Sequence, residues 1–244
     1  MNTQINPNSI ARRAGWLYLL LIPLGFFGLM YVPEVLLVAD NPQATFANIQ
    51  ANEMGLRLSV LAAFSIQVIQ IFIALALYDL FKHVDRTWSQ IIVIFTLAAM
   101  PVALLNELSR VAVLYFIHDS ALTALFTTEQ LQQAVLFLLD LNEDGIMIAH
   151  IFWGVWLLPM GVLILKSDFI PKIIGWMMVL AFFGYIADTV VWLLIPGETI
   201  DVALYTFYGE VILPLWLVIK GVKQNNWQSW AANSAAQTRA LSAA

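Results

Sequence analysis

The sequence predicts an all-α polytopic membrane protein, a bundle of six transmembrane helices with short interfacial helices on the outer side. Composition is the first observation behind this prediction, because 61% of the 244 residues are hydrophobic and only 11% are charged. An ordinary soluble domain has roughly 45–50% apolar and about 25% charged residues. The second observation is a set of long apolar runs separated by short polar segments, with a mean hydropathy of +0.82. Together they exclude an ordinary soluble domain.

Six apolar stretches have the length of about 20 residues that a helix needs to cross a hydrocarbon core about 30 Å thick. They form one predicted transmembrane domain, residues 1–223, and a tail, residues 224–244, predicted to be an interfacial anchor followed by a disordered cytoplasmic end. The predicted spans are residues 14–32, 56–80, 88–117, 146–165, 173–195 and 202–219.

The first span follows two Arg residues, as a signal peptide would, but no small-residue cleavage pattern closes it. We therefore expect a retained helix. After the first span, Asp40 and Asn41 as possible caps before Pro42 predict a short helix at the interface. Thr127 and Gln130 resemble a capping box, which opens either an interfacial helix or an outer extension of the fourth span.

The segments that connect the spans alternate along the chain between those with Lys and Arg and those without. Three connections hold no Lys or Arg and carry acids such as Asp40, Asp119, Glu198 and Asp201. By the positive-inside rule, both termini are predicted to be cytoplasmic, which suits an inner (plasma) membrane protein. Nine of the 11 basic residues lie on the other side: Arg12, Arg13, Lys82, Arg86, Lys166, Lys172, Lys220, Lys223 and Arg239.

Polar residues inside the spans are the candidate functional residues, because each buried charge costs about 2.5–3.5 kcal/mol on insertion scales. At a rise of 1.5 Å per residue, Asp188 and His150 lie roughly 24 Å from their flanking Lys, and Glu210 lies roughly 15 Å from Lys220. The spacing predicts an outward-facing polar cavity. Its predicted lining residues are Gln67, Gln70, Glu107, Arg110, Asp144, His150, Asp188 and Glu210.

Each candidate also has a plainer interpretation. Glu107 and Arg110, three residues apart, suit an intrahelical ion pair, and the two Gln residues suit hydrogen bonds between helices. A lone His in a span suits a packing role. Asp188 and Glu210 have no basic neighbour one turn away, so they are either held neutral by desolvation or paired across helices, for example with Arg110. Tyr205 and Tyr208 are candidate hydroxyl donors, and Trp192 a candidate aromatic wall.

The sequence lacks a Walker loop, a dinucleotide fingerprint, a nucleophile elbow and a His-Glu-x-x-His motif. Cysteine is absent, which excludes disulfides and thiolate metal sites, and the net charge of −5 gives no basic surface for nucleic acid. The expected partner is the lipid bilayer, and a homo-oligomer stays open. No cofactor is indicated, and whether a metal binds is left open.

Several short motifs follow one another along the chain. They are Arg-x-Ala-Gly-Trp-Leu-Tyr ending at Tyr18, Ala-Leu-Tyr at 76–78, Leu-Leu-Asp-Leu at 138–141, and Lys166-Ser167 followed by Pro171-Lys172 and Gly175. In this order, the motifs resemble an uncharacterised bacterial membrane family, the domain of unknown function DUF4386. The resemblance covers most of residues 11–195. It implies a bacterial multi-span membrane protein and supplies no activity, substrate or site residue.

Three functions compete. The first is a bundle that handles a proton, a cation or a small polar ligand through Asp188 and Glu210, with Pro23, Pro101, Pro159 and Pro214 as sites where kinks expose carbonyls. The second is a structural or partner-binding membrane protein without a ligand site. The third is a metal-dependent membrane hydrolase with His150 and carboxylates as ligands. Whether the protein is an enzyme is left open, with a non-enzymatic role favoured, and the first function is the preferred hypothesis.

Overall fold

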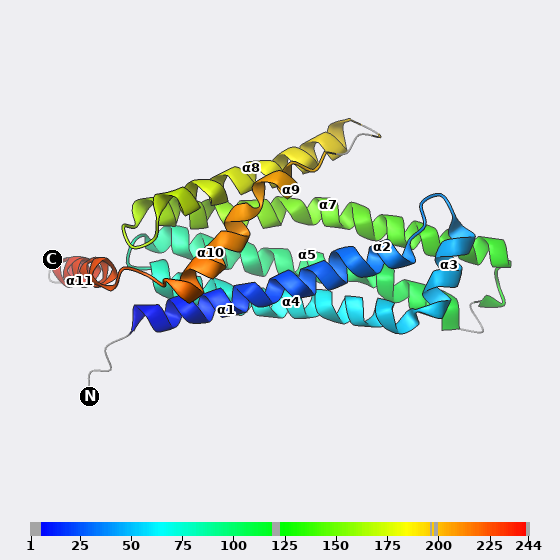
Figure 1. Cartoon of the computed structure of the whole chain (residues 1–244), viewed down its shortest axis with the longest axis horizontal. Helices are drawn as coiled ribbons and strands as arrows, with labels where there is room; N and C mark the ends of the chain where they lie inside the picture. The colour runs from blue at the N-terminus through cyan, green and yellow to red at the C-terminus, as the bar shows by residue number, and fades with distance from the viewer. Residues whose placement is uncertain (1–5, 119–122, 196, 198–199, 243–244) are drawn as a thin grey trace. The chain divides into compact units, whose positions relative to one another are not determined.

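The chain is mostly helical in the part that the computed structural model describes, which is residues 6–118, 123–195, 197 and 200–242. Asp119 and Glu198, used above to predict orientation, lie outside these residues. Figure 1 follows the helices along the chain. They are α1 (Pro7–Gly25), η1 (Phe26–Tyr31), α2 (Val32–Leu36), α3 (Pro42–Ala51), α4 (Glu53–Phe81), α5 (Arg86–His118), α7 (Thr128–Lys166), α8 (Lys172–Leu194), α9 (Val202–Thr206), α10 (Tyr208–Ile219) and α11 (Gln224–Ser242).

Six helical segments among the described residues are long and apolar enough to cross a membrane, which confirms the predicted fold class. They contain the six predicted spans almost entirely, and they are Pro7–Leu36, Glu53–Phe81, Arg86–His118, Thr128–Lys166, Lys172–Leu194 and Val202–Ile219. Large apolar side chains on them stay exposed, such as Leu105, Phe137 and Leu193. A lipid-facing surface explains this exposure, because no water has to be excluded from it.

Both predicted helix starts in the connections are present. The backbone N–H of Ala44 donates to Asn41 Oδ1 at 3.0 Å, so Asn41 caps α3 with Pro42 in its first turn. The N–H of Thr127 donates to Gln130 Oε1 at 2.9 Å, and the N–H of Gln130 donates to Thr127 Oγ1 at 3.2 Å. This capping box opens α7, which runs without a break to Lys166 and so extends the fourth span.

The tail differs from the predicted disordered end, because the structure continues it as α11. Five alanines in this segment, Ala231, Ala232, Ala235, Ala236 and Ala240, favour a helix, because Ala has the highest intrinsic helix propensity. Trp227 anchors the start of α11, since its indole N–H donates to the backbone carbonyl of Leu80 at 2.8 Å. This hydrogen bond holds the start of α11 against the end of α4.

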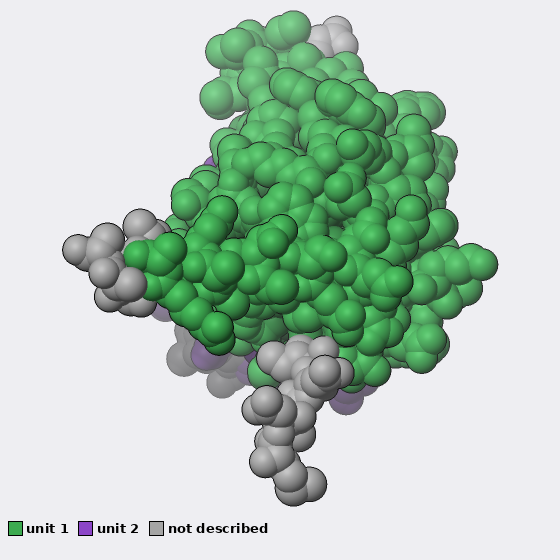
Figure 2. Space-filling model, turned by 90° about the vertical axis from the view of Figure 1, so that its left-hand side faces the viewer, with its two compact units in different colours: residues 1–19, 70–99, 150–244 green, residues 20–69, 100–149 purple. Residues whose placement is uncertain are grey.

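The chain divides into two compact units, coloured separately in Figure 2. Unit 1 comprises residues 1–19, 70–99 and 150–244, and unit 2 comprises residues 20–69 and 100–149. The boundaries between them fall within α1, α4, α5 and α7.

Unit 1 contains closely packed helices around a core that includes Leu77, Leu157 and Leu213. Gly161 on α7 and Gly175 on α8 let two backbones approach, because a Cβ on Gly161 would lie 2.8 Å from the Gly175 carbonyl oxygen. Small residues at such contacts are a general device for packing membrane helices.

Unit 2 has its own apolar core, whose buried members are Val32, Leu36, Ile49, Leu56, Val113, Val135 and Leu139. These residues come from α2, α3, α4, α5 and α7, so the short helices after the first span are packed rather than loose. Thr45 on α3 is fully buried and accepts a hydrogen bond from the N–H of Val38 at 2.9 Å, which fixes the turn between α2 and α3.

Candidate functional site

The eight predicted cavity residues fall into both units. Unit 2 holds Gln67, Glu107, Arg110 and Asp144, and unit 1 holds Gln70, His150, Asp188 and Glu210. A single cavity that all eight line stays a prediction, and each group is described within its own unit.

Glu210 is the centre of a hydrogen-bonded cluster in unit 1. Tyr185 on α8 donates its hydroxyl hydrogen to Glu210 Oε1 at 2.9 Å, and Tyr18 on α1 donates to Oε2 at 3.2 Å. Tyr18 is only 4% exposed and packs against Trp156 with ring centroids 5.6 Å apart. Among the described residues, no Lys or Arg pairs with Glu210. The carboxyl group is therefore held by two neutral donors from two other helices.

The two tyrosines of this cluster were not among the predicted site residues. The sequence instead suggested Tyr205 and Tyr208, which are 73% and 53% exposed. Tyr185 lies three residues before Asp188, on one helix face, and this spacing was the available signal. Tyr18 lies too close to the basic flank to be told from an interfacial tyrosine by sequence, because such tyrosines are common there.

His150 on α7 lies beside the same cluster. Its ring centroid is 5.1 Å from that of Tyr185, edge to face, and 5.2 Å from that of Trp153. The Nδ1 atom of His150 is buried and has no hydrogen-bond partner among the described residues. A buried polar atom without a partner is uncommon in proteins, and the indole nitrogen of Trp216 is a second example in the described part of the chain.

Asp188 has backbone partners instead of a basic one. It is 2% exposed and accepts hydrogen bonds from the N–H groups of Val202 at 2.7 Å and Ala203 at 3.0 Å. These N–H groups begin α9 and have no acceptor within that helix. Asp188 thus fixes the start of α9 against α8, an arrangement that neither sequence interpretation of this residue included.

Glu107 and Arg110 form the predicted intrahelical ion pair in unit 2, with Arg110 Nη1 3.1 Å from Glu107 Oε2. Both side chains are buried. Arg110 Nη2 also donates to the carbonyl oxygen of Gly28 at 3.1 Å and to the hydroxyl of Ser59. The guanidinium group therefore links α5 to η1 and α4.

The carbonyl of Gly28 is available to Arg110 because of the π-helix. In an α-helix it would accept the N–H of Val32, but that N–H donates to Phe27 five residues back. In a π-helix the Gly28 carbonyl would accept the N–H of residue 33, but that residue is Pro33, which has no N–H. Arg110 therefore donates the hydrogen bond to the Gly28 carbonyl that neither Val32 nor Pro33 provides.

Asn106 and Asn142 join α5 to α7 in the same unit. The amide of Asn106 donates to the carbonyl of Asn142 at 3.0 Å, and the amide of Asn142 donates to the carbonyl of Asn106 at 3.1 Å. Gly145 permits this contact, because a Cβ there would collide with the Asn106 side chain. Asn142 is buried and was missed by the sequence analysis, since an Asn among acidic residues on an outer segment suggests a solvated one.

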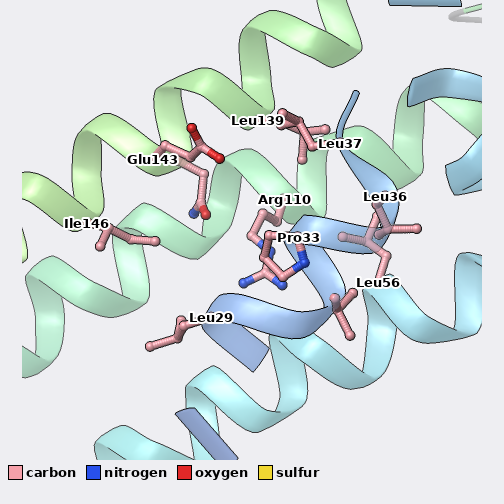
Figure 3. A pocket seen from close by; sticks show the side chains of 11 residues that line it. Leu29, Pro33, Leu36, Leu37, Leu56, Arg110, Leu139, Glu143 and Ile146 are labelled. Carbon is pink, nitrogen blue, oxygen red and sulfur yellow. The ribbon is translucent and has the colours of Figure 1, made fainter. Parts of the chain in front are cut away.

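A small pocket lies beside this network, and Figure 3 shows Arg110 next to Pro33 with Glu143 on the neighbouring helix. Leucines such as Leu36, Leu56 and Leu139 form much of its wall. Its volume is about 50 Å³, far below the roughly 300–1,000 Å³ of ligand pockets. A water molecule needs roughly 10–15 Å³ on this measure, so the pocket suits a few water molecules.

The remaining predicted residues are dispersed. Asp144 is exposed and lines a shallow groove with Asn106 and Gly145. Gln67 is buried and Gln70 is half-buried on α4. Within the described residues, no three His, Asp or Glu side chains gather into a group that could hold a metal ion. The metal-dependent hydrolase hypothesis thus lacks the set of ligands that it requires.

Comparison with known proteins places the chain among uncharacterised relatives. An uncharacterised protein of Archaeoglobus fulgidus is 32% identical over 165 residues, which cover 68% of this chain and 85% of that protein. This relative is archaeal, so a bacterial origin for the present chain stays a prediction. No solved structure matches significantly. The family model described as "Domain of unknown function (DUF4386)" matches residues 13–221, and the chain belongs to this family.

Proposed function

We propose that this membrane protein binds and releases a proton at Glu210, as one step in handling a proton or a cation. The hydrogen bonds from Tyr18 and Tyr185 to a carboxyl group without a basic partner carry the proposal. Ionisable groups inside membrane spans commonly mark proton and ion pathways.

The tyrosines suit both protonation states of Glu210. A tyrosine hydroxyl can donate to a carboxylate, and its oxygen can accept a hydrogen bond from a protonated carboxyl group. An Arg or Lys partner would instead favour the ionised state throughout. The cluster therefore permits a change of charge without loss of its hydrogen bonds.

We also propose that the protein lies in the plasma membrane with both termini in the cytoplasm. The distribution of Lys and Arg along the sequence supports this orientation. The bilayer is then the principal partner, which agrees with the large apolar side chains exposed on the spans.

Infrared difference spectroscopy on the protein in liposomes tests the proposal. We expect a carbonyl-stretch band of a protonated carboxyl group that disappears as pH rises, and that is lost in Glu210→Gln. Glu129→Gln, which alters an exposed acid in the first turn of α7, should keep the band. Proton uptake measured with a pH-sensitive dye should fall in Glu210→Gln by about one proton per chain.

The structural alternative makes the opposite prediction. If Glu210 serves only to join helices, Glu210→Gln retains hydrogen bonds through its amide and leaves the infrared pH difference unchanged. That result, in a variant with an unaltered melting temperature, would refute proton binding at Glu210.

A further inference from the structure

Tyr185 contacts two titratable groups in unit 1. Its ring lies edge to face with His150, and its hydroxyl donates to Glu210 Oε1 at 2.9 Å. His150 lies on α7, Tyr185 on α8 and Glu210 on α10. A basic and an acidic side chain therefore flank one hydroxyl-bearing residue.

The unpartnered Nδ1 atom of His150 needs an explanation. Leaving a buried polar group unsatisfied costs about 1–3 kcal/mol. A residue that only fills space here would be better replaced by Phe, which has the same aromatic contacts with Tyr185 and Trp153 and no polar atoms. A nitrogen that exchanges a proton accounts for this cost.

Four titratable groups face His150. Asp188 and Asp201 act on it electrostatically, Tyr185 contacts its ring, and Glu210 lies beyond Tyr185. Asp188 is engaged by the N–H groups of Val202 and Ala203, whereas Asp201 is exposed. Asp201 thus provides an acidic group in contact with solvent near His150.

We propose that His150 and Glu210 exchange one proton across Tyr185, so that His150 is the second proton-binding residue of the site. The inference rests on the proposed function of Glu210. In the exchange, protonated His150 loses a proton and Glu210 gains one. Because His150 Nδ1 has no hydrogen-bond partner among the described residues, the proposed exchange includes one water molecule between His150 and Tyr185. The water receives the proton from His150 and passes one to the Tyr185 oxygen as the hydrogen of Tyr185 moves to Glu210 Oε1, so the water and the hydroxyl are regenerated and charge is conserved.

Nitrogen-15 NMR of histidine-labelled protein in liposomes tests this exchange, because the chain has only three histidines. His150→Gln identifies the His150 signals. Interacting groups titrate as a pair, so we expect Glu210→Gln to move the pH midpoint of His150 by about one pH unit. Tyr185→Phe should give a comparable shift, since it keeps the ring contact and removes the hydroxyl.

Matched variants separate coupling from general disturbance. Tyr205→Phe removes an exposed hydroxyl, and Glu129→Gln removes an exposed acid; neither should move the His150 midpoint by more than about 0.2 pH unit, well below the pair interaction of about one unit. The Glu210→Gln and Tyr185→Phe arms retain His150, so the test does not depend on the folding of His150→Gln.

The outcomes distinguish this inference from the proposed function. If the Glu210 carbonyl band titrates but Glu210→Gln leaves the His150 midpoint unchanged, the exchange is refuted and proton binding at Glu210 stands. If the carbonyl band is absent at every pH, the proposed function fails and the exchange fails with it.

Discussion

Arg110 contacts three elements of unit 2 through a single buried guanidinium group, with partners on α5, η1 and α4. Burying an ion pair is costly, and its attraction repays the cost only when further hydrogen bonds satisfy the remaining donors. Gly28 and Ser59 supply such bonds. The pair therefore sets the positions of these helices more than it adds to net stability.

We predict that Arg110→Gln destabilises the protein by about 3–5 kcal/mol, because Glu107 is left buried without a cation. The double variant Arg110→Met with Glu107→Leu should lose less than the single variant. Unfolding free energies from detergent titration measure both. Arg57→Gln, which breaks the exposed pair with Glu53, should cost at most about 1 kcal/mol. Equal losses for the two Arg variants would contradict the role given to burial.

At the scale of elements, Pro33 acts on Arg110 through η1. It withholds the N–H that would otherwise bond to the Gly28 carbonyl. We predict that Pro33→Ala and Arg110→Met are coupled by about 1–2 kcal/mol in a double-mutant cycle, because both act on one carbonyl. Pro23→Ala, in the same helical span, should show no coupling with Arg110→Met. Additive effects for Pro33 would mean that Gly28 is not the shared acceptor.

Asp85 fixes the start of α5 in unit 1. It accepts the N–H of Trp88 at 3.2 Å and pairs with Lys166 at 2.7 Å. Partial burial opposes ionisation, but the hydrogen bonds from Lys166 and Trp88 outweigh it and lower the pKa of Asp85. The folded state therefore binds the proton less readily than the unfolded chain.

This lowered pKa gives a prediction with a definite sign. The stabilisation from Asp85 is complete above the ordinary Asp pKa of about 3.9 and is lost as pH falls through the lowered value. Asp85→Asn keeps a capping oxygen but loses the ion pair with Lys166, so it should cost at most about 1 kcal/mol at pH 7, and the difference from wild type should shrink towards zero in acid. Asp79→Asn, which alters a carboxylate that pairs with Lys82 and is more exposed than Asp85, is the control and should cost less. A difference that grows on acidification would contradict the prediction.

At the scale of the whole molecule, much of the fold follows from the sequence, because lipid requires each spanning segment to satisfy its own backbone hydrogen bonds. The six spans, the α3 cap and the α7 capping box were all readable from local patterns. The Glu107–Arg110 pair was readable for the same reason, since both residues lie on one helix.

Contacts between helices were not readable in this way. Asp188 with the N–H groups of α9, and Glu210 with Tyr18, join residues far apart in the sequence. No periodicity on one helix specifies its partner on another. The sequence predicted exposed carbonyl groups at prolines within the spans. The structure instead leaves the Gly28 carbonyl free of a helical N–H partner, because a π-helix at Phe26–Tyr31 is followed by Pro33. Local spacing identifies the polar residues of this chain, and packing decides their partners.

The orientation of the molecule provides the last prediction. With six candidate spans among the described residues, both termini are expected to face the same side, and the excess of Lys and Arg predicts that this side is the cytoplasm. A green fluorescent protein fused after residue 244 should fluoresce in a bacterial host, and alkaline phosphatase fused after Leu125 should be active. With the two reporters exchanged, the fluorescent protein should not fluoresce and the phosphatase should be inactive. Active phosphatase after residue 244 would reverse the orientation, and it would place the exposed Asp201 on the cytoplasmic side.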